Sequence, residues 1–391
     1  MSRFRSAEMS KVEGMRTLAV VGGGVIGSAV AWRAAESDWD VTLFDPAPGS
    51  GASWVAGGML APLSEAWPGE REALEFGAAS LDRWPGFGAR IEAATGNSVF
   101  VAEETLTVAL DAADAADLRT IADFVAETGP QEPGARHPLR LLDRAGVRAA
   151  EPGLARTVRA GLLAPTETAV DNRLLVQALR LCCEQSGVHM RAEAVTTLDN
   201  LGFDRIVLAA GASAARLWPG LAVRPVKGEI LRLRHRPGAP PPPRRVIRAR
   251  VHGRPVYFVP RADGIVVGAT QYEAGFDTAV TVAGVRDLIA DAEAVLPALG
   301  EYELAEAAAG SRPVTPDNLP LIGALSERVI VAAGHGRNGM LGVPLTVDAV
   351  LSLLGGDDAL PEARAADPAR FSHSLGATAV AGAASFTGGN R

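Results

Sequence analysis

The stretch TLAVVGGGVIGSAVAWRAAESDWDVTLFD, residues 17–45, decides the fold. The β-branched, apolar run Thr17–Val21 leads into three glycines and predicts a strand, and the small apolar residues of Val25–Glu36 predict a helix that packs closely on a sheet. Val41–Asp45 is a second apolar run and predicts another strand. Two such strands joined by a helix form a βαβ unit, in which a parallel sheet is buried on both faces.

The glycines of this unit follow the pattern GxGxxG at Gly22, Gly24 and Gly27. Glycines between a strand and a helix let the backbone turn tightly and approach a pyrophosphate at the positive N-terminus of the helix. Asp45 ends the second strand, where its carboxylate can accept hydrogen bonds from a ribose. The pattern therefore indicates an adenine dinucleotide rather than a merely structural turn. The acid disfavours the 2′-phosphate of NADP and leaves FAD and NAD open.

Buried strands of the same kind are expected at Phe203–Ala210 and Arg328–Ala333, whereas Val226–Ala269 alternates in the manner of antiparallel strands, with a hairpin turn at Ala262–Gly264. We therefore predict an α/β fold: a Rossmann-type FAD-binding domain built from three chain segments, with an inserted α+β antiparallel-sheet substrate domain. The expected limits are 1–83, 150–224 and 312–370 for the first domain, 84–149 and 225–311 for the second, and 371–391 for a disordered tail.

Helical spacing of apolar residues predicts further helices at Leu74–Ala94, Ala112–Glu127, Ala283–Val295 and Leu341–Leu354. The segment VDNRLLVQALRLCCEQSG predicts another, capped by Asp171 or Asn172 and stopped by Gly187. Its cysteines, Cys182 and Cys183, fall on the apolar face. They are therefore expected to pack in the core rather than to carry chemistry.

Composition limits the partners. The chain has 391 residues, 48% of them hydrophobic, and a formal net charge of -7, which argues against nucleic acid or an anionic membrane as a partner. No apolar run reaches the ~20 residues of a membrane helix. The N-terminus, where Met9 or Met15 is a candidate start, is polar and unlike a signal peptide. The two adjacent cysteines indicate no disulfide framework, and we expect a cytoplasmic protein without a metal site.

Two other segments are informative. In SWVAGGMLAP, Ser53–Pro62, paired glycines permit close approach to a flat ligand, although a plain loop before a helix is an equal alternative. In RVIVAAGHGRNGML, Arg328–Leu341, a buried strand ends at Gly334 and glycines then open a helix, which makes a second anion or carbonyl site. A single NAD-binding unit does not need this second site. The pyrimidine end of a flavin does, so the segment favours FAD.

The order GxGxxG, AGGM, an inserted antiparallel sheet, SRPVTPDNLPLIG (Ser311–Gly323) and AAGHGRNGM resembles the D-amino acid oxidase family of flavoproteins over roughly Leu18–Leu354. Within that family the segments SWVAGGMLAP, PVKGE, VYFVPR and GIVVGAT are most similar to the glycine oxidases of thiamine biosynthesis. The resemblance implies non-covalent FAD, because the cysteine that anchors flavin in related sarcosine oxidases has no counterpart after Cys183.

The resemblance, together with the glycine motif, assigns a set of FAD contacts. Val195 would lie at the adenine end, and the backbone N–H groups of His335 to Leu341 would lie near the flavin O2. We expect a local hydrogen bond for His335 rather than a role as general base. The complete expected set is Gly22, Gly24, Val25, Ile26, Gly27, Asp45, Pro46, Ala52, Ser53, Gly57, Gly58, Met59, Val195, Gly211, His335, Gly336, Arg337, Asn338, Gly339, Met340 and Leu341.

On the substrate side the resemblance implies that Arg312 clamps a carboxylate, that Tyr257 and Arg337 lie beside the substrate, and that Met59 limits the pocket volume. An arginine suits this role because it meets a carboxylate with two parallel charge-assisted hydrogen bonds. The alternative for Arg312 is an ordinary surface arginine, and the alternative for Tyr257 is a residue of the core.

The function that these features imply is oxidative deamination of glycine, and of sarcosine or small D-amino acids, with dioxygen as electron acceptor. The products would be an imine or glyoxylate, ammonia and hydrogen peroxide, and the imine would supply thiamine thiazole formation. By analogy the protein would be a homo-oligomer, such as a tetramer. A dehydrogenase with another electron acceptor is one alternative. A non-enzymatic flavin protein is the other, because Gly57 and Gly336 stand where relatives are expected to have larger residues.

Overall fold

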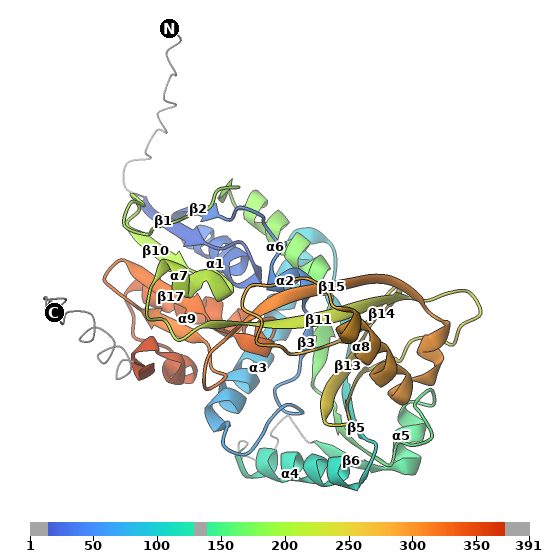
Figure 1. Cartoon of the computed structure of the whole chain (residues 1–391). Helices are drawn as coiled ribbons and strands as arrows, with labels where there is room; N and C mark the ends of the chain where they lie inside the picture. Colours follow the sequence, from blue (N-terminus) through green and yellow to red (C-terminus); the bar gives the residue numbers. More distant parts are fainter. Residues whose placement is uncertain (1–14, 129–138, 372–391) are drawn as a thin grey trace, which may run out of the picture.

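The run before the glycines forms a central strand of a six-stranded sheet in the computed structural model, which describes residues 15–128 and 139–371. The strand order is β16-β17-β10-β1-β2-β9, and all neighbours are parallel except β16 and β17. The bounds are β1 Arg16–Val21, β2 Trp39–Phe44, β9 His189–Arg191, β10 Arg205–Leu208, β16 Leu321–Ala324 and β17 Val329–Ala333. Segments from the beginning, middle and end of the chain therefore meet in one sheet, as predicted (Figure 1).

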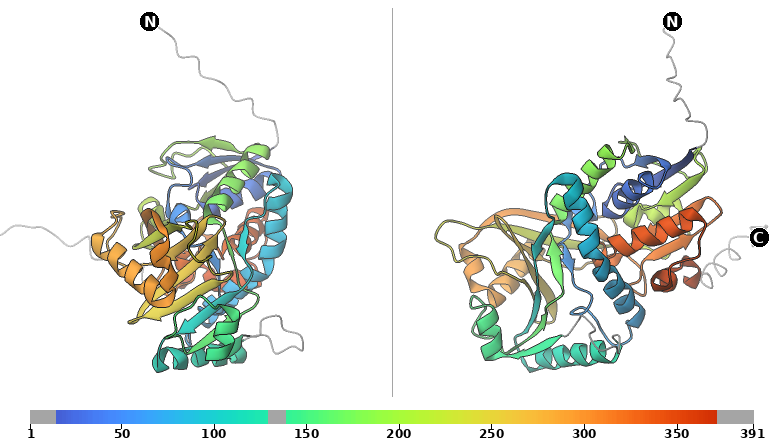
Figure 2. Two further views of the ribbon diagram at one scale, coloured as in Figure 1. Left: turned by 90° about the vertical axis from the view of Figure 1, so that its right-hand side faces the viewer. Right: turned by 180° about the vertical axis from the view of Figure 1, so that it is seen from behind.

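Four helices share the apolar core on one face of this sheet, with α1 and α9 lying against the strands: α1 Val25–Ala35, α3 Arg71–Thr95, α6 Asn172–Gln185 and α9 Val343–Gly355. The small residues of α1 let it lie close to the strands, and it is buried on nearly all sides. From behind, α3 is seen along its length beside α9 (Figure 2). On the opposite face of the sheet, Val21, Leu208 and Val331 pack against apolar residues that precede Arg224, among them Leu198 and Ala214.

Eight strands form the second sheet, in the order β15-β11-β14-β13-β12-β5-β7-β6. Its neighbours are antiparallel except β5 and β12. The hairpin between β13 and β14 turns at Ala262 and Asp263, as predicted. The bounds are β5 Thr105–Ala109, β6 Arg140–Asp143, β7 Ala160–Ala164, β11 Arg224–Arg234, β12 Val246–Val251, β13 Arg254–Arg261, β14 Gly264–Gly268 and β15 Glu303–Val314.

Three helices cover the second sheet. α8, Val282–Val295, and α5, Arg144–Ala150, share a core with Phe258, while α4, Ala112–Thr128, packs on Ala109 and Leu162. A third, small sheet of β3 Met59–Leu60, β8 Thr168–Val170 and β4 Phe100–Ala102 connects the regions around the two large sheets. The short helix α2, Ala52–Val55, precedes β3. This connection carries the AGGM segment from the parallel sheet towards the antiparallel one.

Most of the expected helices are present at the predicted places. In α6, the Asp171 side chain accepts hydrogen bonds from the N–H groups of Arg173 and Leu174, which identifies Asp171 rather than Asn172 as the cap. Both cysteines are buried and unbridged. The last predicted helix is wrong at its start: α9 begins only at Val343, because the glycine-rich residues before it form a short 3-10 turn at Gly336–Asn338.

The expected division of the chain into five domain segments stays a proposal. At two of its borders, a strand is assigned to a different domain from the strands with which it pairs. β7 lies in segment 150–224 but pairs with β5 and β6, and Arg312–Val314 is the end of β15. Residues 1–14 and the expected tail from position 372 onward lie outside the described residues, whereas Phe371, the first residue of that tail, ends the 3-10 turn Pro368–Phe371. Within the described residues, no helix combines the length and apolar character needed to cross a membrane.

Candidate functional site

The glycine loop between β1 and α1 is held in a shape that only glycine permits. Gly22 has φ +111°, and a Cβ there would lie 2.3 Å from the carbonyl oxygen of Ala209. A Cβ on Gly27 would lie 1.8 Å from the carbonyl oxygen of Gly22. The loop therefore lies against the end of β10, and Gly24, the N-cap residue of α1, has no side chain of its own to cap the helix. Such a glycine cradle at a helix N-terminus fits a pyrophosphate.

Asp45 is brought to this loop from the end of β2. Its carboxylate accepts hydrogen bonds from the N–H of Gly23 at 2.6 Å and from the N–H of Ala47 at 2.8 Å. The two bonds fix the carboxylate beside the glycine loop, where the ribose of a dinucleotide is expected.

The remaining predicted cofactor segments follow the carboxyl ends of neighbouring parallel strands. Val195 comes after β9 and is half-buried, Gly211 comes after β10 with φ +54°, and His335 comes after β17. Pro46 is exposed directly after Asp45. The carboxyl ends of parallel strands meet at one edge of a sheet, which is where ligands of such sheets bind. The structure therefore gathers these residues at one edge.

The AGGM segment is tied to both sheets. The Ser53 hydroxyl accepts a hydrogen bond from the N–H of Val25 at 3.1 Å, at the start of α1. A Cβ on Gly58, which has φ +90°, would lie 2.0 Å from the carbonyl oxygen of Val170, and a Cβ on Gly57 would lie 2.6 Å from Cε2 of Tyr257. Both glycines are therefore required by their neighbours, and Gly57 places the loop directly against a strand of the second sheet.

A buried polar cluster, which the sequence did not reveal, holds this segment. The Asn172 side-chain amide donates hydrogen bonds to the carbonyl oxygens of Ser53 and Trp54, and Arg261 donates one to the carbonyl oxygen of Gly57 at 2.8 Å. The Asn172 oxygen accepts from Arg261 at 3.1 Å and from Arg232 at 3.0 Å. Burial lowers the pKa of Arg261 to about 10. In the sequence, Asn172 was distinguishable only as a candidate cap.

Arg312 lies on β15 opposite Val226 of β11. Its guanidinium lies against Gly228, where a Cβ would be 2.1 Å from Nη1, and Nη1 donates a hydrogen bond to the carbonyl oxygen of Thr270 at 3.1 Å. Among the described residues, no carboxylate forms an ion pair with Arg312. A half-buried guanidinium without a protein counter-ion is suited to bind a carboxylate from outside the chain.

Tyr257 lies on β13, and its ring occupies space that two glycines leave free. A Cβ on Gly268 of β14 would lie 2.3 Å from its hydroxyl oxygen, and Gly57 approaches the same ring. Met59 and Tyr257 pack in one small apolar cluster. Burial raises the pKa of Tyr257, although the positive charge of Arg312 opposes the shift. Tyr257 and Met59 thus pack against one cluster, and the charge of Arg312 acts on the Tyr257 ring; the roles of these three residues beside a substrate stay a prediction.

Arg337 points to a carboxylate that the sequence analysis missed. Its guanidinium forms ion pairs with Glu65 at 2.7 Å and Glu70 at 3.2 Å, and Glu65 also pairs with Arg248 at 3.0 Å. Burial opposes ionisation of Glu65, but Arg248, Arg337 and Arg312 together hold its pKa below the usual value. Arg337 is thus occupied by protein carboxylates, whereas Arg312 is not.

A second buried carboxyl group, Glu167, fixes the chain between Met59 and Glu65. It accepts hydrogen bonds from the N–H groups of Leu63 and Ser64 and from the Ser64 hydroxyl, at 2.6–2.8 Å. Burial raises the pKa of Glu167 to about 7. No sequence motif marks this residue, because its partners lie about a hundred positions earlier.

The late glycine segment begins at His335, which is buried and makes a hydrogen-bond contact of 2.9 Å between Nε2 and the Thr346 hydroxyl. Burial lowers the pKa of His335 to about 3, so the ring is neutral at physiological pH. Met340 and Leu341 are buried, and the Leu341 carbonyl oxygen accepts hydrogen bonds from Ser80 and Trp84 of α3. The segment is therefore anchored at both ends, and the turn Gly336–Asn338 lies between them.

No group of three or more metal-ligating side chains gathers within residues 15–128 and 139–371. The polar clusters at the site consist instead of arginine, asparagine and carboxylate side chains. Their chemistry suits anion binding and the positioning of loops.

The comparisons with known proteins agree with this geometry. The family model described as FAD dependent oxidoreductase matches residues 17–351. The chain is 31% identical over 359 residues to a bifunctional protein ThiO/ThiG of Nostoc sp., which covers 87% of this chain and 52% of that relative. The chain thus spans about half the length of that bifunctional relative.

A glycine oxidase of Geobacillus kaustophilus is 31% identical over 354 residues, covering 84% of this chain and 90% of the relative. A crystal structure of glycine oxidase from the same organism matches with a TM-score of 0.81 and 28% identity, over 91% of this chain and 99% of the solved one. The match therefore extends over both large sheets and is not confined to the dinucleotide motif.

Proposed function

Because this chain belongs to the family of FAD-dependent oxidoreductases, we propose that it oxidises the amine of a small amino acid, with glycine as the preferred substrate. When bound, FAD would supply the redox chemistry, namely hydride abstraction from the substrate Cα and transfer of two electrons to dioxygen. Two relatives support the substrate class, since one is named glycine oxidase and another ThiO/ThiG.

The proposal rests on the Arg312 guanidinium, which has no carboxylate partner among the described residues. Its positive charge lowers the pKa of Glu65 and opposes the rise in the pKa of Tyr257. Glycine offers little apolar surface, so its carboxylate is the main group by which a protein can hold it. A bidentate arginine pair fixes the orientation of the substrate as well as its affinity. We propose that Arg312 orients the Cα–H bond in this way.

Tyr257 and Met59 form the wall that favours a small substrate. Both side chains belong to one packed cluster, and the Tyr257 ring is held closely by Gly57 and Gly268. We propose that this wall limits the size of the substrate side chain. The preference for glycine over sarcosine and small D-amino acids therefore rests on the packing around Tyr257.

The residues present fit FAD. The glycine loop would hold the pyrophosphate, Asp45 the ribose, and the segment from His335 to Leu341 the flavin through backbone N–H groups. Both cysteines lie on α6, where burial raises the pKa of Cys182 to about 11 and that of Cys183 to about 12. We therefore propose that FAD is held without a covalent bond, and that acid precipitation of the protein releases a yellow supernatant.

The overall reaction would convert glycine, dioxygen and water into glyoxylate, ammonia and hydrogen peroxide. Before hydrolysis the immediate product is an imine, which in thiamine biosynthesis would enter thiazole formation. No side-chain base is needed when the amine arrives unprotonated, and we expect the rate to increase towards alkaline pH.

Oxygen consumption tests the proposal directly. Purified protein supplied with FAD and glycine should consume dioxygen and form an equal amount of hydrogen peroxide. If glycine reduced an artificial dye but consumed no dioxygen, the protein would be a dehydrogenase instead. If neither occurred with glycine, sarcosine, D-alanine or D-proline, the proposed activity would be wrong.

A further inference from the structure

Exposed large apolar side chains are concentrated in one short stretch of sequence, the loop after β14 and the helix α8 that follows it. Half of those in the described part of the chain come from residues 272–289: Tyr272, Phe276, Val280, Val282 and Ile289. Val282 is 89% exposed. Val280, Val282 and Ile289 line one shallow hollow, whereas the Phe276 ring lies against Arg216. Exposed apolar residues that gather on one face mark an interaction surface, whereas scattered ones do not.

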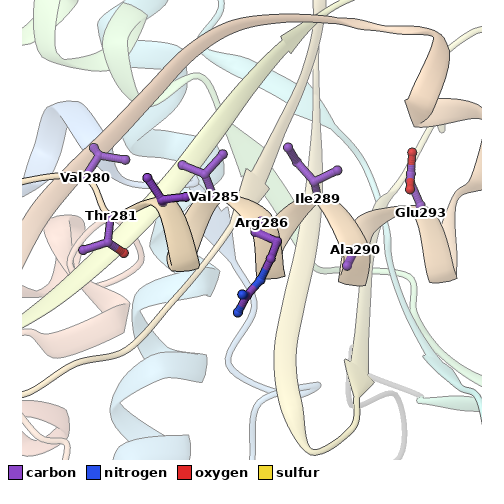
Figure 3. A pocket seen from close by; sticks show the side chains of 8 residues that line it. Val280, Thr281, Val285, Arg286, Ile289, Ala290 and Glu293 are labelled. Carbon is purple, nitrogen blue, oxygen red and sulfur yellow. The ribbon is translucent and has the colours of Figure 1, made fainter.

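The helix α8 supplies much of this surface and has two different faces. Leu288, Ala292 and Val295 face inward and are buried in the core of the second sheet. Figure 3 shows the outward side chains, which come from successive turns of the helix and line a shallow hollow. The α8 residues of this outward face are Val282, Val285, Arg286, Ile289, Ala290 and Glu293. The inward face already stabilises the monomer, so the outward apolar residues need another explanation.

The outward face carries one positive and one negative side chain, which could pair with those of a second copy of the chain related by a two-fold axis. Arg286 precedes Glu293 by two helical turns, a separation of about 10 Å along the axis. If two copies of α8 lie antiparallel with the axis between Ile289 and Ala290, Arg286 of each copy lies level with Glu293 of the other. Ile289 of each copy then lies level with Ala290 of the other at the centre, with charges on either side. An isologous contact has this symmetry.

Both charged groups are free to exchange partners. Among the described residues, Arg286 forms an ion pair only with its sequence neighbour Asp287, at 2.8 Å, and its side chain is 72% exposed. Exposed pairs of this kind contribute little to stability, so forming a new pair loses little. No ion pair involves Glu293 within residues 15–128 and 139–371.

We propose that the outward face of α8 is the contact between two copies of this chain, paired antiparallel across a two-fold axis. The same face supplies both charges and the apolar band between them, which favours a second copy over an unrelated partner. A tetramer would need another contact in addition, and the α8 pair would remain one of its two interfaces.

Charge reversal tests this pairing. The mass of the full chain loaded with FAD is measured by light scattering and by sedimentation at micromolar concentration. We expect Arg286→Glu and Glu293→Arg each to halve the mass and to weaken association by about tenfold or more, because like charges then face each other. The double variant R286E/E293R should restore the wild-type mass. Arg180→Glu on the exposed surface of α6 is the matched control and should change nothing.

Three outcomes would overturn the proposal. The wild-type chain could be monomeric at these concentrations, the single reversals could leave the mass unchanged, or the double variant could fail to recover it. The melting temperature and FAD content of each variant show that a loss of mass does not come from unfolding. None of these residues belongs to the candidate active site, so oxygen consumption by the variants tests the proposed function separately.

Discussion

At the residue scale, Gly57 shows how an apparent departure from a family pattern can be explained by packing. From sequence alone, this glycine stood where a larger residue was expected and weakened the assignment of a substrate pocket. In the structure, the space of its missing side chain is taken by the ring of Tyr257, with Gly268 on β14 approaching the same ring. The glycines therefore place the tyrosine.

We expect Gly57→Ala to displace the Tyr257 ring, because the new Cβ would lie 2.6 Å from Cε2. The value of kcat/KM for glycine should fall by about tenfold or more, while bound FAD is retained. Gly86→Ala in α3 is the control, since its Cβ would meet no atom within 4 Å. Equal activity of the Gly57 variant and the control would show that the ring position does not matter.

Substitutions of Arg312 test the carboxylate clamp. Arg312→Ala should raise the apparent KM for glycine by about 30-fold or more, which corresponds to the ~2–3 kcal/mol of a charge-assisted pair. Arg312→Lys should recover only part of this loss, because an ammonium group lacks the two parallel donors. Arg234→Ala removes an exposed arginine of β11 and should have no effect. An unchanged KM in the Arg312 variants would exclude the clamp.

At the residue scale, the sequence identified Arg312 and Tyr257 through resemblance but gave no indication of Glu65 or Glu167. The reason is physical. A buried carboxylate is recognised by the arginines and N–H groups around it, and these come from distant positions. A single sequence does not show which distant residues will meet.

At the element scale, the start of α6 separates two roles that the sequence could not distinguish. Asp171 caps the helix, and Asn172 is therefore free to hold the carbonyl oxygens of Ser53 and Trp54. Both contacts span more than a hundred residues. They connect the helix to the loop that is expected to contact FAD.

Asn172→Ala should weaken FAD binding by about tenfold and destabilise the fold by about 1–3 kcal/mol, because buried donors and acceptors lose their partners. Asn172→Asp keeps an acceptor for Arg232 and Arg261 and should lose less. Asn97→Ala, in an exposed turn after α3, is the control. FAD affinity is measured by fluorescence quenching and stability by urea unfolding. An alanine variant with wild-type FAD affinity would show that the cluster does not support the cofactor loop.

The buried His335, which precedes α9, should make the free energy of unfolding depend on pH. His335 has a pKa of about 3 in the fold, below the ordinary histidine value of 6.5, because burial opposes the charged ring. Between these values the unfolded chain binds a proton that the folded chain does not. The stability is therefore complete above about pH 6.5 and falls by up to about 1.4 kcal/mol per pH unit towards pH 3.

In His335→Gln this contribution is absent. The loss of melting temperature between pH 7 and pH 5 should therefore be smaller in this variant than in the wild type. His252→Asn, in an exposed turn with φ +52° that asparagine tolerates, should behave like the wild type. Identical pH profiles for the His335 variant and the wild type would contradict the assignment of a buried neutral ring.

At the scale of the whole molecule, the sequence predicted the assembly of a parallel sheet from three distant segments, because each strand shows the same buried pattern. It did not predict that β7 joins the second sheet. The segment AGLLA lacks alternation, since Leu162 packs in the core under α4 and Leu163 in the core shared with α5 and α8. A strand that is buried on both faces looks alike in either sheet. The choice of partner strands depends on contacts that are distant in sequence.

The central claim is that this fold presents a small amino acid to FAD, and the visible spectrum of the purified protein under anaerobic conditions tests it most directly. The account predicts a yellow protein whose flavin absorbance is bleached on addition of glycine and returns when dioxygen is admitted. A yellow protein that neither glycine, sarcosine nor a small D-amino acid bleaches would contradict the proposed activity, and a protein that stays colourless after FAD is supplied would contradict the account as a whole.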